Sequence, residues 1–185
     1  HSPPHPQTQP TTSRRQRQMC IRDRLGIDSS DPNFILKTLN KIIKKVDIGR
    51  LRMSLNLVHF QNGSMKMSSA AMPPMYHFEK KKNKVDEITI SNLPLGGLMT
   101  ENFTVMDKKF SKDDVLVMIS DGLPEAPNKD GELLDYAAVK DCIEKHSTKT
   151  ASEIKDELVK LSDKWMNGIH NPDDITIVVC KKLKN

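Results

Sequence analysis

The chain has 185 residues, which is enough for one domain with a substantial core, and no stretch approaches the ~20 apolar residues that span a bilayer. Its net charge is +5, but residues 1–24 hold five Arg and one Asp, so the remaining residues carry only about +1. This balance lacks the electrostatic footprint of a nucleic-acid-binding domain. We therefore expect no nucleic-acid partner and no membrane contact within this chain.

The first 24 residues stand apart in composition. Residues 1–13 contain only Pro, His, Gln, Ser and Thr, and we expect them to be disordered because they have no aliphatic side chain to bury. Residues 13–24 resemble the translated sequencing-adaptor peptide found at the ends of genes from fragmentary assemblies. A natural basic tail is the alternative. Either way, the sequence predicts a disordered basic segment over 1–24 and a partial domain over 25–185.

Helical and strand periodicities follow in blocks. Asp31-Pro32 is typical of a helix start, and apolar residues then recur at helical spacing as far as residue 46. Alternation with a period of two begins at residue 51, and Asn62-Gly63 indicates a hairpin. The return strand is predicted to begin at Met65 and to be broken by Pro73-Pro74. Further strands are predicted at 75–79, 86–91, 103–110 and 114–119, and lysines at 80–84 indicate a turn.

Two helices and one strand complete the chain. Apolar spacing predicts one helix over 134–143, and Thr150 with Glu153 forms a capping box that begins a second. The last strand is predicted over 175–179. Because strands are sequential and helices are gathered in blocks, the fold class is α+β, a β-sandwich flanked by helices.

Two acidic turns carry the chemistry. Five apolar residues run directly into Ser120-Asp121-Gly122, and Asp173-Asp174 opens another apolar run. Continuous apolar runs are typical of strands buried on both faces. If the two strands are neighbours, the carboxylates converge and repel unless a divalent cation such as Mg²⁺ or Mn²⁺ lies between them. Such a cation lowers the pKa of a bound water and activates it as a nucleophile.

Each acidic segment, taken alone, also has a purely structural explanation. Ser-Asp-Gly and Asn-Pro-Asp-Asp are common turn sequences. The histidines at 59, 77, 146 and 170 are isolated in sequence, which favours surface or half-buried positions over a ligand role. Cys142 and Cys180 read as buried or half-buried thiols in a reducing compartment, so we expect the protein, or this domain of a larger sensor, to be cytoplasmic.

Four segments, in order, resemble the SpoIIE-type branch of the metal-dependent PPM (protein phosphatase 2C-like) serine/threonine phosphatases. They are Ser69–Pro74, Leu93–Gly96, Val115–Asn128 and Pro172–Thr176, and the resemblance covers about residues 28–183.

This resemblance implies a metal-dependent enzyme. It implies two Mn²⁺ or Mg²⁺ ions in the intact domain, with Asp121 and Asp173 as ligands of one of them. Asp174 is the alternative ligand, or a residue that supports the site. The expected reaction is hydrolysis of phosphoserine or phosphothreonine on a regulatory, anti-anti-sigma-like protein by metal-activated water.

The chain also departs from the family pattern. Members carry an upstream Gly-Asp-x-x-Gly-His-Gly segment whose Asp bridges the metals, and these 185 residues contain no such segment. We therefore expect weak metal binding and little turnover from this chain. A non-catalytic interaction module on the same scaffold is the alternative function. Ala71, where the family variant has Gly, is expected to affect only a turn.

Overall fold

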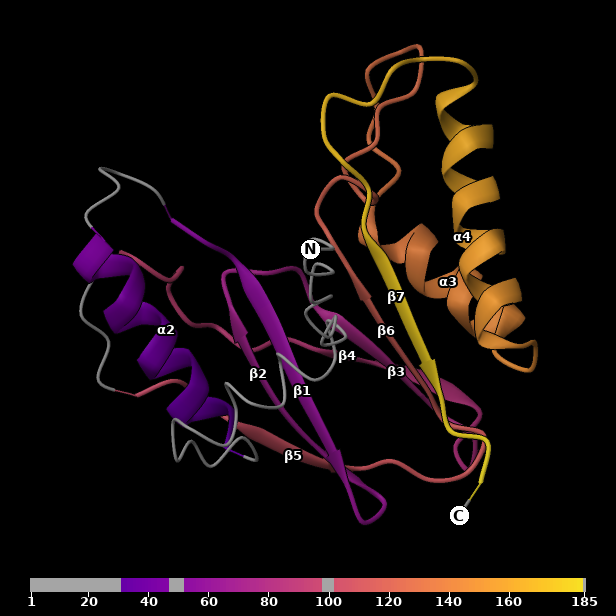
Figure 1. Ribbon diagram of the computed structural model, residues 1–185. Coiled ribbons are helices and arrows are strands. Elements are labelled where there is room, and N and C mark those ends of the chain that lie inside the picture. The colour runs from indigo at the N-terminus through magenta and orange to yellow at the C-terminus, as the bar shows by residue number, and fades with distance from the viewer. Residues whose placement is uncertain (1–30, 47–51, 98–101, 185) are drawn as a thin grey trace, which may run out of the picture.

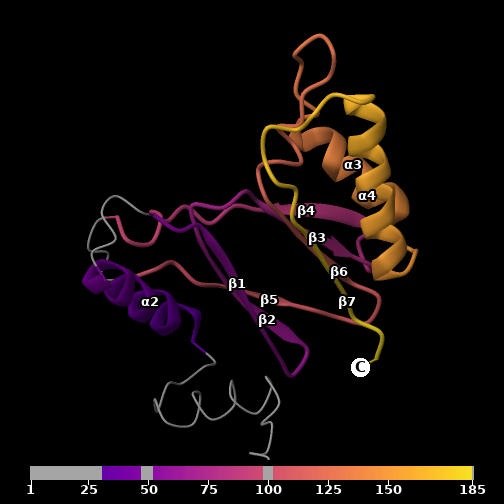
Figure 2. The same ribbon diagram turned by 45° about the horizontal axis from the view of Figure 1, so that its top comes forward.

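The computed structural model describes residues 31–46, 52–97 and 102–184. The segment predicted to be disordered, residues 1–24, lies outside the described residues. The described elements form four layers: one helix, two antiparallel sheets and a pair of helices, in that order, as Figures 1 and 2 show. This arrangement confirms the predicted α+β sandwich flanked by helices.

Helix α2, Pro32–Val46, covers the outer face of the first sheet. The Asp31 carboxylate accepts a hydrogen bond from the backbone N–H of Asn33 at 3.0 Å, so it caps the helix as the sequence predicted. The apolar side of the helix packs with residues of the sheet and of the 92–97 turn in one cluster, whose fully buried members are Leu36, Ala70, Leu95 and Phe103.

The first sheet has the strand order β1-β2-β5, with bounds Leu55–Gln61, Ser64–Ala70 and Met106–Lys109. The predicted hairpin at Asn62-Gly63 joins β1 to β2, and both residues have positive φ, 47° and 77°. Such angles match the twist of a tight hairpin, which explains the Asn-Gly pair. Ala71, directly after β2, also has positive φ at 51°, a conformation that favours glycine.

The second sheet has the order β4-β3-β6-β7, with bounds Lys84–Ile88, Met75–Glu79, Val115–Ile119 and Ile177–Lys181. Buried apolar side chains from the strands and from residues that directly follow them form one cluster between the sheets: Met65, Met67, Met75, Ile88, Ile90, Phe110 and Leu116. Strand β6 is almost wholly buried, as its five consecutive apolar residues predicted.

Strand β7 differs from its prediction. It was expected to be buried on both faces, but among the described strands it lies at the edge of its sheet, and Val178 is 43% exposed. It also begins two residues later than predicted. A run of apolar residues therefore marked a strand here without fixing its place in the sheet.

Helices α3, Tyr136–His146, and α4, Ala151–Met166, cover the outer face of the second sheet. The predicted capping box is present: the Thr150 hydroxyl accepts from the N–H of Glu153, and the Glu153 carboxylate accepts from the N–H of Thr150 at 2.8 Å. The Lys181 ammonium on β7 donates to three carbonyls after α3, those of Ser147, Thr148 and Lys149. The last strand thus holds the end of α3.

Candidate metal centre

The two acidic turns meet because their strands are paired. Strands β6 and β7 are antiparallel, with Ile119 opposite Ile177, so the end of β6 lies beside the start of β7. Asp121 follows β6 by two residues, and Asp173-Asp174 precede β7 by three to four. The predicted adjacency of the two strands is therefore present, at the end of the second sheet that Figure 1 draws uppermost.

Ser120 joins the two turns. Its hydroxyl donates to the backbone carbonyl of Asp174 at 3.0 Å and accepts from the backbone N–H of Thr176 at 2.9 Å, while its own N–H donates to the Thr176 carbonyl at 3.0 Å. One short polar side chain therefore continues the β6–β7 ladder past the last strand residue. Ser120 was not predicted to take part, although its place between the strand and Asp121 was the available signal.

Gly122 sets how closely the turns approach. A Cβ at this position would lie 2.6 Å from the Asp174 carbonyl oxygen and 3.3 Å from the Asp173 Cβ. Any side chain at residue 122 would therefore push the two turns apart. Asn171 stabilises the close approach of the two turns, because its side-chain amide donates to the Gly122 carbonyl at 2.8 Å. Asn171 was also missed from the sequence.

The three aspartates are exposed, and two of their carboxylates lack partners. The Asp121 carboxylate accepts one hydrogen bond, from the N–H of Gly122 at 3.1 Å. Within the part of the chain that the structure describes, the Asp173 and Asp174 carboxylates have no hydrogen bond or ion pair. The nearby Gly122 and Asp174 carbonyls already accept from Asn171 and Ser120. Carboxylate oxygens are thus the donors left for a cation.

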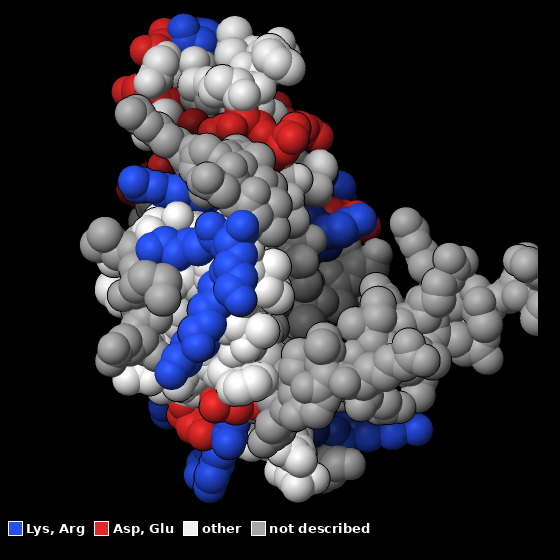
Figure 3. Space-filling view, turned by 60° about the vertical axis from the view of Figure 1, so that its left-hand side comes forward, with Lys and Arg blue, Asp and Glu red and all other residues white. Residues whose placement is uncertain are grey.

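Further acidic residues surround this end of the molecule. The pKa of the Tyr136 phenol is raised, first by burial and then by the negative charges of Glu125, Asp121 and Asp135. Figure 3 shows acidic side chains gathered near the top of one face, at the level of the loops beside β6 and β7, and a basic stripe lower down, at the level of α2. The field at the candidate centre is therefore negative, which favours a cation.

The donor chemistry fits a hard divalent ion such as Mg²⁺ or Mn²⁺, but the donor set is partial. Among residues 31–46, 52–97 and 102–184, no three His, Cys, Asp or Glu side chains are grouped so that they could hold a metal ion. Asp121, Asp173 and Asp174 therefore supply ligands of the right type on adjacent turns, but their carboxylates are not grouped as a complete metal site.

Among the described residues, no histidine or cysteine forms a metal-binding group with these carboxylates. His77 was expected at the surface or half-buried, but it is 1% exposed between the two sheets. It lies there because its strand, β3, is central and its side chain points to the same face as Met75. Cys142 and Cys180 are free and half-buried, as predicted.

In the described part of the chain, no helix is long and apolar enough to cross a membrane.

Comparisons with known proteins identify relatives of this arrangement. Residues 20–182 match the family described as Stage II sporulation protein E (SpoIIE). The phosphoserine phosphatase RsbU of Bacillus subtilis is 26% identical over 157 residues, which cover 82% of this chain and 45% of RsbU. Stage II sporulation protein E of the same organism is 28% identical over 82% of this chain and 18% of its own length. The chain thus spans less than half the length of these relatives.

Solved structures share the fold. The SiaA-PP2C domain of Pseudomonas aeruginosa superposes with a TM-score of 0.75 at 16% identity, over 89% of this chain and 66% of that domain. The manganese-soaked phosphatase domain of Bacillus subtilis SpoIIE gives a TM-score of 0.59 at 24% identity, over 97% and 76% of the two chains. At these identities the likeness shows the fold alone, and it is the PP2C-type fold.

Proposed function

This chain belongs to the SpoIIE family of PP2C-like phosphatases, and from that membership we propose that it forms part of a metal-dependent protein serine/threonine phosphatase. The proposed reaction is hydrolysis of phosphoserine or phosphothreonine on a regulatory protein. A single observation supports it: the turns that carry Asp121 and Asp173-Asp174 are placed side by side by β6 and β7, and the latter two carboxylates have no partner in the described part of the chain.

Asp121 and Asp173 are the proposed ligands of a Mn²⁺ or Mg²⁺ ion, and Asp174 is a third ligand or a support for the other two. When bound, the ion supplies charge stabilisation for the phosphoryl group and activation of water. Ser120 and Asn171 hold the two turns in register, and Gly122 lets the two turns approach each other closely. Two ions are proposed for a complete domain of this family.

The proposed substrate is a phosphorylated, anti-anti-sigma-like regulatory protein, and the proposed location is the cytoplasm. Two findings support the substrate: RsbU is named a phosphoserine phosphatase, and a structure of the RsbU and RsbW domains of a Mycobacterium tuberculosis protein shares the fold with a TM-score of 0.64. The free, half-buried thiols of Cys142 and Cys180 suit a reducing compartment.

We further propose that these 185 residues alone bind metal weakly and turn over slowly, since they contain no Gly-Asp-x-x-Gly-His-Gly segment. The partial donor set among the described residues also favours a second candidate, a non-catalytic interaction module on the same scaffold. The two functions differ in one measurable property, because only the enzyme requires a divalent ion at Asp121.

Replacing Asp121 by Asn tests the metal centre. The change keeps the shape of the side chain but removes its charge, so we expect the affinity of the chain for Mn²⁺, measured by titration calorimetry, to fall about tenfold or more. Mn²⁺-dependent hydrolysis of an aryl phosphate, by this chain or a longer form of it, should be abolished. The thermal unfolding temperature without metal should not fall, because the carboxylate is exposed.

Asp130→Asn is the matched control, since Asp130 is an exposed aspartate in the loop that follows the same strand. This variant should bind Mn²⁺ as the parent chain does. Equal Mn²⁺ affinity in the parent, Asp121→Asn and Asp130→Asn proteins would remove Asp121 from the site and leave the interaction module as the function.

A further inference from the structure

The two acidic turns lie beyond the last strand pair of β6 and β7. The strand ladder ends with Ile119 opposite Ile177. Among the described residues, one further backbone hydrogen bond joins the two segments, from the N–H of Ser120 to the Thr176 carbonyl at 3.0 Å. Beyond these residues, no backbone hydrogen bond of the described chain connects one turn to the other. Side chains therefore decide how the turns are held together.

Ser120 supplies the first side-chain link. Its half-buried hydroxyl donates to the Asp174 carbonyl at 3.0 Å and accepts from the Thr176 N–H at 2.9 Å. One oxygen atom thereby replaces the N–H and the carbonyl that a residue of a paired strand would offer. Of the small side chains, those of Ser and Thr have a strong donor and a strong acceptor on one atom. The link therefore requires a hydroxyl at this position.

Asn171 supplies the second link, from the other turn. Its side-chain amide donates to the Gly122 carbonyl at 2.8 Å, and its side-chain oxygen accepts from the Asp173 N–H at 3.4 Å. The first of these bonds crosses between the turns, and the second is local to the turn that carries Asn171. This side chain therefore connects the backbone beside Asp121 to the backbone of Asp173.

Neither link uses a carboxylate of the candidate centre. The two side chains bond backbone groups of residues 122, 173, 174 and 176. Within the described part of the chain, the Asp173 and Asp174 carboxylates have no hydrogen bond or ion pair. The backbone of both turns is thus held while these carboxylates stay free to turn toward a cation. Ligands on a backbone that is already ordered lose less conformational entropy when they bind.

We propose that Ser120 and Asn171 are positioning residues for the metal centre, and that closure of this end of the β6–β7 ladder and binding of the cation stabilise each other. The positioning role rests on the metal-dependent function proposed above. Because coupling between two equilibria is reciprocal, links that favour the cation-binding arrangement are strengthened by the bound cation to the same extent. Residues that orient metal ligands change metal affinity by about ten- to a hundredfold when they are replaced.

The Mn²⁺ affinity of single variants tests the positioning role. Ser120→Ala removes both bonds of the hydroxyl, and Asn171→Ala removes the bond to Gly122, so each should weaken Mn²⁺ binding by the whole chain about tenfold in titration calorimetry. Ser120→Thr keeps a hydroxyl and should retain the parent affinity. A merely structural role would lower the unfolding temperature of Ser120→Ala without changing its Mn²⁺ affinity.

Ser64→Ala is the matched control. Ser64 is also half-buried, and its hydroxyl donates to the Gln61 carbonyl at 2.9 Å in the β1–β2 hairpin of the other sheet. This variant loses a comparable hydrogen bond, but one that does not involve either acidic turn. It should therefore bind Mn²⁺ as the parent chain does, even where its unfolding temperature falls.

Amide exchange tests the reciprocal effect. The Thr176 N–H has the Ser120 hydroxyl as its acceptor, so its exchange rate reports directly on that link. Excess Mg²⁺, which is diamagnetic and suits NMR, should slow exchange at Thr176 severalfold in the parent chain and in Ser120→Thr. In Ser120→Ala this amide has lost its acceptor, so it should exchange rapidly with and without Mg²⁺.

The outcomes separate the positioning role from the metal centre. If Asp121→Asn loses Mn²⁺ affinity while Ser120→Ala and Asn171→Ala bind like Ser64→Ala, the positioning role is overturned and the metal centre stands. The same conclusion follows if Mg²⁺ leaves exchange at Thr176 unchanged in the parent chain. If Ser120→Ala does not fold, Asn171→Ala and the parent exchange rate decide the question. Equal Mn²⁺ affinity in the parent, Asp121→Asn and Ser120→Ala proteins would overturn both proposals.

Discussion

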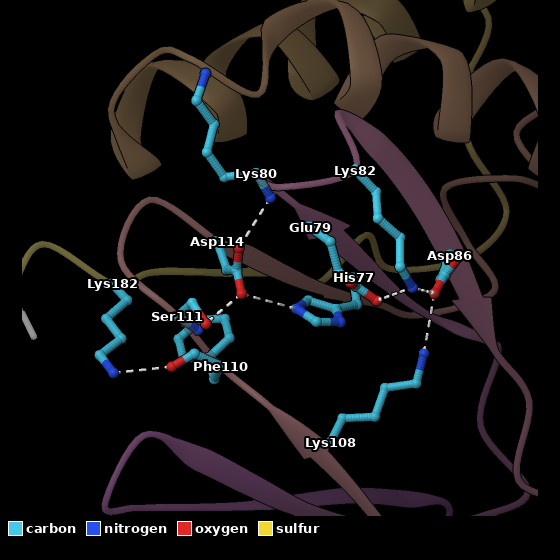
Figure 4. Close-up of polar contacts among 10 residues, drawn as sticks. All are labelled: His77, Glu79, Lys80, Lys82, Asp86, Lys108, Phe110, Ser111, Asp114 and Lys182. Atoms are coloured by element: carbon cyan, nitrogen blue, oxygen red, sulfur yellow. Dashed lines mark hydrogen bonds and ion pairs between the residues drawn. The ribbon is translucent and has the colours of Figure 1, made fainter.

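His77 is the residue whose environment departs most from its sequence context. It is buried between the sheets, its Nε2 lies 3.5 Å from an Asp114 oxygen, and neither ring nitrogen forms a hydrogen bond to a described residue. Asp114 instead accepts from the N–H groups of Lys80 and Ser111 at 2.8 and 2.7 Å, as Figure 4 shows. Asp114 is therefore satisfied without His77.

Burial lowers the pKa of His77 below its usual 6.5, against the raising effects of Asp114 and Glu79, while Lys108 adds to the lowering. The unfolded chain then binds more protons than the folded one as the pH falls through 6.5. Stability is thus fully present above that pH and is lost progressively toward the lower folded-state pKa, with a slope of at most about 1.4 kcal/mol per pH unit.

His77→Leu should flatten this dependence. Denaturant unfolding at several pH values from neutral to mildly acidic should show a smaller loss of stability in the variant than in the parent, because the variant has no imidazole to protonate. His170→Leu, at an exposed site, is the control and should keep the parent slope. Parallel curves for the parent chain and His77→Leu would show that the buried imidazole does not titrate in this range.

At the level of elements, Gly122 joins the two halves of the candidate centre. An alanine Cβ would lie 2.6 Å from the Asp174 carbonyl oxygen, which is backbone and cannot rotate away. Gly122→Ala should therefore separate the turns and cost about 1–3 kcal/mol in unfolding free energy, as overpacking does. Mn²⁺ affinity should fall together with stability.

Gly131→Ala provides a comparison in the next loop. An added Cβ there meets nothing within 4 Å, although its φ of 80° adds backbone strain. This variant should lose stability through strain yet keep its Mn²⁺ affinity. If Gly122→Ala also keeps full Mn²⁺ affinity, then the close approach of the two turns is not needed for the metal.

The elements were predictable where local chemistry decides them. Capping residues placed the starts of α2 and α4, Asn62-Gly63 placed the first hairpin, and a continuous apolar run identified β6 as buried. The edge position of β7 was not predictable, because periodicity reports apolar faces and says nothing about which strands are neighbours. Ser120 and Asn171 were missed for a related reason: their partners lie about 50 residues away in the chain.

At the scale of the whole molecule, the sandwich was predicted from the order of strands and helices, and the adjacency of the two acidic turns followed once β6 and β7 were neighbours. The completeness of the metal site could not be predicted in the same way. The ligands of a metal site come from segments that are distant in sequence. The aspartates at 121, 173 and 174 identify two of these segments and do not indicate whether further ligands lie beside them.

The charge distribution of the molecule makes a separate prediction. Because residues 25–185 carry about +1 in total, they should not shift duplex DNA in a gel at physiological salt. The full chain, with its five N-terminal arginines, is the comparison, and any shift that it produces should disappear as salt increases. A salt-sensitive shift by residues 25–185 alone would assign a nucleic-acid partner to the domain, with the basic stripe at the level of α2 as its first candidate surface (Figure 3).

The pairing of the final strand with β6 has a consequence for biosynthesis. Residues 177–181 leave the ribosome well after residues 115–119, yet they lie beside them and hold the end of α3 through Lys181. A nascent chain therefore carries Asp121 for some 50 residues before Asp173 exists to face it. The proposed centre therefore cannot assemble until the segment from Asp173 to Lys181 has been synthesised and has paired with β6.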